Sequence, residues 1–301
     1  MAVILHDLCL ARNWEHDAGF ARLLDSACAA RGLTLLDVNP RTLGESLPLL
    51  ARREGGFRVF LDRASEADPA YLPLVGIAKS LGARRLNPRE LADHAYDKAA
   101  MHRVLRQAGL HTPATLILPP YCAQPTLPAP DLTPLGGRFA VKPALGGGGD
   151  GVATEISAFE QVLVERQQFP GQHYLLQAHV TPKALDGLPA WFRVIYCLGK
   201  IYPSFWDTST HVYTRVTSEQ ETRFGLGNLR EVTERIARIC CLDLFSSEIA
   251  LTEEGRFLVV DYVNDPIDLR LQSRAVDGVP DFIVEDVAAR IAATAIKNQV
   301  S

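Results

Sequence analysis

The segment SEIALTEEGRFLVVDYVN, residues 247–264, decides the fold of this chain. Its two strand-like runs, Ser247–Leu251 and Arg256–Val263, flank the pair Glu254-Gly255. Two apolar runs separated by an acidic residue and a glycine are typical of a tight β-hairpin, because glycine accepts the positive φ that such turns need. We therefore expect an antiparallel hairpin whose two-residue tip is 254–255.

Two acidic side chains oppose each other across this hairpin. With the tip at 254–255, Glu253 faces Arg256 and Glu248 faces Asp261 on one face. Like charges directly opposite in a sheet are destabilising unless a cation lies between them, and hard divalent ions prefer carboxylate oxygens. Asn264 adds a neutral oxygen nearby. The hairpin therefore predicts a metal site, whereas a register one residue off would leave one carboxylate in solvent.

A glycine tract, Gly146–Gly151, forms the second informative segment. Its spacing formally matches a dinucleotide-binding fingerprint, but Val152–Ile156 after it looks like a strand, whereas the fingerprint must open a helix. No Lys-Ser/Thr pair follows, so it is no P-loop. Two interpretations remain: a flexible turn, or a flap whose backbone N–H groups close over phosphates. Lys142 ends the strand before the tract, either as a solvated charge or as a cation beneath the flap.

Three arginines are candidate anion ligands. Arg193 lies within the apolar strand Trp191–Leu198, and a buried arginine needs an anionic partner. That partner is either a structural carboxylate or a bound phosphate or carboxylate. Arg270 follows Asn264 by six residues. Arg215 belongs to a polar stretch, 207–223, which is either a substrate loop or plain surface.

The order of expected elements predicts three lobes. Strands and helices alternate over residues 1–90, which favours a parallel α/β lobe. Residues 91–180 contain a proline-rich stretch and short strands, typical of a small antiparallel lid lobe, and residues 181–301 read as a larger α+β lobe. The expected strands are Met1–Leu5, Leu33–Val38, Phe57–Leu61, Arg138–Lys142, Val152–Ile156, His173–Val180, Trp191–Leu198 and Lys200–Trp206, besides the hairpin above. The expected helices are His16–Arg31, Pro69–Ala83, Asp97–Ala108, Ala158–Gln167, Leu229–Ile239 and Val279–Thr294.

The composition excludes several classes of protein. The chain has 301 residues, with 31 Lys and Arg against 35 Asp and Glu, for a net charge of -4. This balance argues against a nucleic-acid binder or a polybasic membrane-surface protein. No apolar run approaches the roughly 18 residues of a membrane span, and the first residues do not look like a signal peptide. The six cysteines form no CxxC pair, so we expect reduced thiols and a cytoplasmic protein.

Taken in chain order, five segments resemble the motifs of the ATP-grasp superfamily. They are Asp97-Lys98 with 108–115, Phe139–Pro143 with the glycine tract, Leu175–Val180, Phe192–Ile201 and Glu248–Asn264. The size and lobe order are similar to those of D-alanine–D-alanine ligase-like carboxylate–amine ligases. The resemblance implies an α/β and α+β chain with a three-lobed ATP-grasp fold, whose N-terminal lobe is Rossmann-like and precedes the ATP-grasp lobes.

The same resemblance implies roles for individual residues. It implies that Lys98 and Lys142 contact the α- and β-phosphates of ATP, and that the flap consists of Gly147, Gly148 and Gly149. The hinge at the adenine would comprise Gln177, His179 and Val180. One or two Mg²⁺ ions, or Mn²⁺, would be held by Glu248, Asp261 and Asn264. Arg193 and Arg270, together with Lys142, would act in catalysis by facing the transferred phosphoryl group or a substrate carboxylate, because bidentate arginine suits either anion.

The implied activity is an ATP-dependent ligase. A small-molecule carboxylate would form an acylphosphate, an amine would displace phosphate, and ADP and phosphate would leave; neither nucleic acid nor membrane is expected as a partner. A small-molecule kinase and a non-catalytic nucleotide-binding protein remain as alternatives, and a nicotinamide-dependent dehydrogenase is a distant fourth. The resemblance leaves monomer and homodimer both open. Asp261 and Asn264 are three residues apart, so a bulge or turn at Tyr262–Val263 is needed to bring them to one face.

Overall fold

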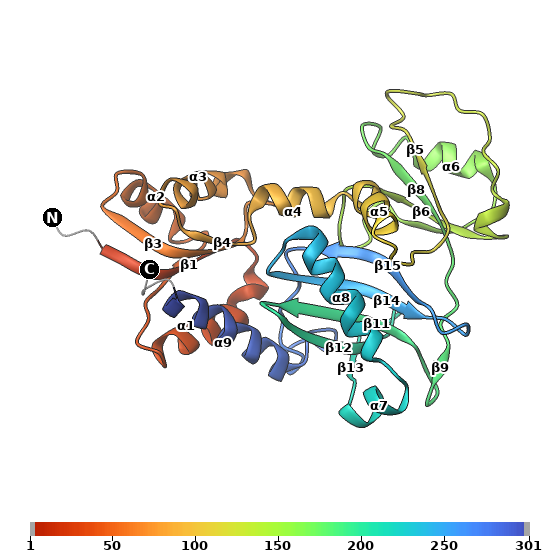
Figure 1. Ribbon diagram of the computed structural model, residues 1–301. Coiled ribbons are helices and arrows are strands. Elements are labelled where there is room, and N and C mark those ends of the chain that lie inside the picture. The colour runs from red at the N-terminus through yellow and green to blue at the C-terminus, as the bar shows by residue number, and fades with distance from the viewer. Residues whose placement is uncertain (1–3, 298–301) are drawn as a thin grey trace.

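The computed structural model describes residues 4–297 and contains three main sheets (Figure 1). The first sheet is parallel, in the order β2-β1-β3-β4. Its strands are β1 Ile4–Arg12, β2 Leu35–Val38, β3 Gly55–Arg63 and β4 Arg84–Leu86. The parallel α/β character expected at the N-terminus is confirmed, although the first three residues of the expected strand Met1–Leu5 lie outside the described residues.

Helices cover both faces of this first sheet because its strands alternate apolar side chains between the two faces. Leu8 and Leu10 of β1 belong to the core shared with α1 and α9, whereas Cys9 and Ala11 belong to the core beneath α2 and α3. The helices are α1 Ala18–Ala29, α2 Leu43–Ala51, α3 Leu72–Ser80 and α9 Asp281–Lys297. The last helix thus returns to the first sheet and packs against α1 (Figure 1).

The second sheet is antiparallel, in the order β5-β8-β6-β7. It comprises β5 Thr115–Leu118, β6 Phe139–Pro143, β7 Ala153–Ile156 and β8 Tyr174–Ala178, and α6 Phe159–Glu165 packs on it. The glycine tract connects β6 to β7, so its expected place at a hairpin tip is confirmed. The helices α4 Arg89–Tyr96 and α5 Lys98–Gln107 precede this sheet in the chain.

The third sheet has five strands, in the order β13-β12-β11-β14-β15, and all neighbours are antiparallel. Its strands are β11 Trp191–Cys197, β12 Lys200–Trp206, β13 Tyr213–Arg215, β14 Leu244–Leu251 and β15 Phe257–Asn264. The remaining elements are α7 Ser218–Arg223, α8 Gly227–Cys240, the small hairpin of β9 Ala184–Leu185 and β10 Leu188–Pro189, and the 3-10 turns Glu15–Asp17, Pro69–Tyr71 and Thr133–Leu135. Helix α8 packs its apolar face against β11 and β12.

None of the helices in the described part of the chain is both long and apolar enough to cross a membrane.

Candidate active site

One cavity of about 710 Å³ is lined from both the second and the third sheet. It also reaches the glycine tract and the loop that follows β15. Every residue to which the resemblance gives a role lines this cavity: Lys98, Lys142, Gly147, Gly148, Gly149, Gln177, His179, Val180, Arg193, Glu248, Asp261, Asn264 and Arg270. Residues as far apart in the sequence as Lys98 and Arg270 therefore meet at one place, which the roles implied for them require.

The carboxylate hairpin has the expected pairing at its centre but a different tip. Glu248 pairs with Asp261, as expected, whereas Leu251 pairs with Phe257. The expected pairing of Glu253 with Arg256 is wrong, because the backbone of Thr252 and Arg256 closes a longer turn, with Thr252 N donating to Arg256 O at 3.0 Å. An irregularity between Glu248 and Ile249 then shifts the register by one residue. The bulge on β15 restores the opposed carboxylates.

A second irregularity brings Asn264 to the carboxylates. Ser246 pairs with Asn264, so two steps along β14 correspond to three along β15. Asn264 Nδ2 donates to Asp261 Oδ2 at 3.0 Å. The bulge expected near residues 262–263 is therefore confirmed, and the amide oxygen of Asn264 is left to bind another group.

The carboxylate of Glu248 is held by two donors from β11. Arg193 Nη1 donates to Glu248 Oε1 at 2.6 Å, and Trp191 Nε1 donates to Glu248 Oε2 at 3.2 Å. Arg193 thus has the structural carboxylate partner considered from the sequence, although its Nε is buried without a partner. Burial raises the pKa of Glu248, and the positive charge of Arg193 opposes that rise.

Lys142 is the buried cation facing Asp261. Its ammonium donates to the backbone oxygen of Val260 at 3.1 Å and lies 5.7 Å from the ring centre of Tyr262. Burial lowers the pKa of Lys142, while the charge of Asp261 opposes this shift. Burial also raises the pKa of Asp261, but Lys142, with Lys98 and Arg193, holds that pKa below its ordinary value. Lys142 and Asp261 therefore each favour the charged form of the other.

The glycine tract encloses one end of the cavity. Lys98, the first residue of α5, donates from its ammonium to the backbone oxygen of Gly146. Gly151 has a φ of 66°, and a Cβ there would lie 2.5 Å from Cε2 of Phe169. Only glycine fits both conditions. Gly148 and Gly149 also have positive φ, and nothing lies within 4 Å of where their Cβ atoms would be. No other part of the described chain therefore crowds these two glycines, and a ligand can approach their backbone closely.

The end of β8 forms another wall. The Gln177 amide is buried and donates to the Tyr262 hydroxyl at 3.2 Å, while His102 Nδ1 lies 2.7 Å from the same hydroxyl. Burial lowers the pKa of His102 to about 4, so this ring is neutral at physiological pH. His179 is more exposed and lies 3.5 Å from Glu155. The Gln177–Tyr262 hydrogen bond ties the second sheet to β15, and the His102–Tyr262 contact ties α5 to the same strand.

Arg270 and two aromatic residues, Trp206 and Tyr213, also line the cavity. Arg270 is paired with Asp268 and Asp277, each at 2.8 Å or less. Sequence reasoning did not assign these two aspartates. His211, from the polar stretch 207–223, also lines the cavity, and its imidazole stacks on the Trp206 ring with the two ring centres 5.3 Å apart. Arg215 lies over Phe282 instead and does not line this cavity.

Within residues 4–297, no group of three or more His, Cys, Asp and Glu side chains is placed to hold a metal ion. A metal between Glu248 and Asp261 would therefore need other oxygens, such as the amide of Asn264 and those of a ligand.

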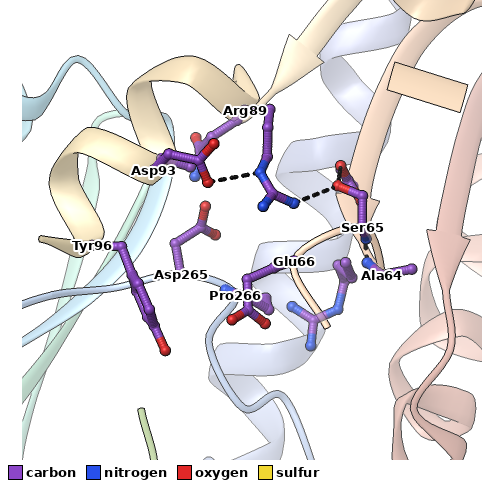
Figure 2. Close-up of a pocket in the computed structure, with 12 residues that line it drawn as sticks. Ala64, Ser65, Glu66, Arg89, Asp93, Tyr96, Asp265 and Pro266 are labelled. Carbon is purple, nitrogen blue, oxygen red and sulfur yellow. Dashed lines mark hydrogen bonds and ion pairs between the residues drawn. The ribbon is translucent and has the colours of Figure 1, made fainter. Parts of the chain in front are cut away.

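A smaller, separate cavity lies where the loop after β15 meets β3 and α4 (Figure 2). Arg89 there donates to Asp93 at 2.7 Å and to Ser65 at 2.9 Å. Asp265 and Glu66 line the same hollow. Burial raises the pKa of Asp265 to about 7. Asn87 and Arg63 oppose this rise, whereas Asp62 and Glu66 add to it.

Replacing Asp265 with asparagine should stabilise the metal-free protein at pH 8. The unfolded aspartate ionises near pH 3.9, whereas the folded one keeps its proton until about pH 7. Folded wild type therefore binds more protons between these values, and its stability falls as pH rises through this window. We expect Asp265→Asn to remove that fall and to add ~2–4 kcal/mol at pH 8 by urea denaturation. Asp25→Asn, at an exposed position on α1, serves as the control. An equal pH dependence in wild type and Asp265→Asn would contradict the assignment.

Solved structures of other proteins are similar to this chain and support its fold, whereas sequence comparisons find no match. No protein-family model matches the sequence, and a search of curated proteins gives no match. A RimK domain ATP-grasp protein from Sphaerobacter thermophilus is 23% identical, with a TM-score of 0.64 over 95% of this chain and 98% of that chain. D-alanine–D-alanine ligase from Bacillus anthracis, complexed with ATP, is 11% identical, with a TM-score of 0.64 over 99% and 97%. The ATP-grasp ligase PsnB, complexed with a minimal precursor, Mg and ADP, is 13% identical, with a TM-score of 0.60 over 98% and 99%. The chain therefore has the ATP-grasp fold that its motifs resemble.

Proposed function

We propose that this chain is an ATP-dependent ligase that joins a carboxylate to an amine through an acylphosphate, releasing ADP and phosphate. The observation that carries the proposal is the single cavity lined by two lysines, a glycine tract and two opposed carboxylates. Such a set of charges suits phosphoryl transfer, which depends on positioning and charge neutralisation more than on a nucleophilic side chain. The ATP, ADP and Mg named in the complexes of structural relatives support the same reading.

The residues present fit ATP with Mg²⁺. Glu248, Asp261 and Asn264 offer the hard oxygen donors that Mg²⁺ prefers. Lys98 and Lys142 would bind phosphate oxygens, and the backbone N–H groups of the glycine tract would approach them closely. A bound Mg²⁺ would neutralise phosphate charge during transfer. Gln177, His179 and Val180 would then hold the adenine ring.

The chain's own groups would guide the reaction after ATP binds. Arg193 and Arg270 would bind the acyl group and the transferred phosphoryl group through their positive charges. Both are paired with carboxylates, so an anionic ligand would exchange with Glu248 at one and with Asp268 or Asp277 at the other. Closure of the glycine tract would exclude water from the acylphosphate, which water would otherwise hydrolyse.

The test is product analysis with Mg-ATP and pools of carboxylic acids and amines. We expect ADP and free phosphate in equal amounts, and only when both a carboxylate and an amine are present. Phosphate retained on an acceptor, with ADP formed, would favour a kinase. Absence of turnover together with ATP binding would favour a non-catalytic protein, and absence of ATP binding would contradict the assignment of the whole site.

A further inference from the structure

A second cavity, of about 570 Å³, adjoins the candidate active site. The two cavities share Val180, Thr208, Trp191 and Trp206. Most of the second cavity's other walls are apolar; they include Leu188 and Val212. We call this second cavity the side pocket. Its volume lies within the usual range of ligand-binding cavities.

The shared tryptophans also contact the charged pair of the active site. Trp191 donates to Glu248, and the guanidinium of Arg193 lies 5.0 Å from the ring centre of Trp206. The wall between the side pocket and the Arg193–Glu248 pair is thus formed by these two indoles. A group in the side pocket would be separated from the reacting groups by about one aromatic side chain.

The side pocket has one charged lining residue among those described, and that residue is exposed to water. Asp207 is its single titratable lining residue among those described. The Asp207 carboxylate accepts hydrogen bonds from Ser209 and from the backbone of Thr210, and these bonds hold its pKa well below its usual value. The other polar lining side chains are threonines, which tolerate apolar neighbours through their methyl groups. Because Asp207 is exposed, water screens its charge, and the apolar remainder of the lining favours an uncharged ligand.

We propose that the side pocket receives a bulky uncharged side chain, aliphatic or aromatic, of the amino-acid or peptide substrate whose reacting group lies at the Arg193–Glu248 pair. This inference rests on the proposed function. Aromatic and branched side chains gain most from burial in such a pocket, and the indoles of Trp191 and Trp206 add apolar surface to its lining. Each added methylene in an apolar pocket typically gives about 10- to 200-fold discrimination. Substrates with large apolar side chains should therefore outcompete their glycyl counterparts.

The test first measures binding without turnover. Two of the chain's three tryptophans line the side pocket, so intrinsic fluorescence reports on it. The probes are N-acetylphenylalanine against N-acetylglycine, and phenylalaninamide against glycinamide, each titrated in the presence of Mg-AMPPNP. Within each pair the reacting group is the same and the side chain differs. We expect at least one phenylalanyl probe to bind tenfold or more tightly than its glycyl partner.

The variant Leu188→Asp places a charge in the side pocket without touching the nucleotide cavity. Leu188 is 37% exposed, so the fold should tolerate the change, and Leu72→Asp, at a residue 45% exposed on α3, is the matched control. We expect Leu188→Asp to remove the preference for the phenylalanyl probe, while AMPPNP binding stays unchanged. The Leu72→Asp control should keep both the preference for the phenylalanyl probe and the affinity for AMPPNP.

The outcomes test the side-pocket inference and the proposed function independently. A wild type that does not distinguish phenylalanyl from glycyl probes, or a Leu188→Asp variant that still does, overturns the side-pocket inference. Parallel ADP assays with the same four compounds test the ligase. Selective binding without ADP formation supports the side pocket and counts against the ligase. ADP formation without a side-chain preference supports the ligase and counts against the side pocket.

Discussion

Replacing Asp261 with asparagine should reduce Mg²⁺-dependent ATP turnover by more than about a hundredfold. Loss of groups that merely orient a metal ligand typically costs 10- to 100-fold, so loss of a ligating carboxylate should cost at least as much. Asp261 sits opposite Glu248 and accepts a hydrogen bond from Asn264, so it is central to the proposed oxygen cluster. Initial rates of ADP formation over a range of Mg²⁺ concentrations, with ATP saturating, measure the effect.

The same variant should also lower the stability of the metal-free protein. Lys142 lowers the pKa of Asp261 in the folded protein. The charged carboxylate therefore stabilises the folded state at pH values above the pKa that this group has in the unfolded chain. Removing it leaves the buried ammonium of Lys142 without that charge, at a cost of ~1–3 kcal/mol at neutral pH. This contribution fades in wild type as pH falls through the folded pKa, so the difference between the proteins should shrink in acid. Urea denaturation at two pH values measures it.

Glu253→Gln is the control for both effects, since it converts a carboxylate to an amide at the exposed tip of the same hairpin. It should leave turnover and stability near wild type. An Asp261→Asn enzyme that retains full Mg²⁺ dependence would rule out Asp261 as a metal ligand.

The pairing of Glu248 with Asp261 shows what the sequence could predict. The apolar runs and the glycine at residue 255 are local signals, and they placed the hairpin correctly. The tip was wrong because Thr252 and Arg256 close a longer turn, and no local signal marks the bulge between Val259 and Asp261 that restores the pairing. Register along a strand is therefore predictable only as far as the pleat stays regular.

Other features depended on contacts between distant segments. The sequence alone could not show which carboxylate pairs with Arg193, because the adjacency of β11 and β14 is a property of the sheet order. Strand β5 was missed because prolines are frequent in the sequence around it. The packing of α9 on α1 could not be predicted because it joins opposite ends of the chain. Trp191 was placed within a strand, but its part in the side pocket appears only when the third sheet is assembled.

Replacing Lys142 with methionine should weaken nucleotide binding by about 10- to 150-fold while the fold remains intact. Hydrogen bonds to charged groups contribute about 1.5–3 kcal/mol, which corresponds to that range. Methionine keeps most of the side-chain volume, so the change isolates the charge. In the wild type the ammonium is bound only to a backbone oxygen of Val260 and lies over Tyr262, which leaves it able to bind a phosphate oxygen.

Isothermal titration with AMPPNP, with and without Mg²⁺, measures this loss, and circular dichroism checks the fold. The matched control is Lys200→Met at the exposed start of β12, which removes a lysine charge from the same chain outside the cavity. Because Lys142 acts on phosphate, its loss should weaken AMPPNP more than adenosine, whose binding depends on the hinge. Equal weakening of both ligands would show a general distortion of the cavity, and unchanged AMPPNP affinity would remove Lys142 from the phosphate site.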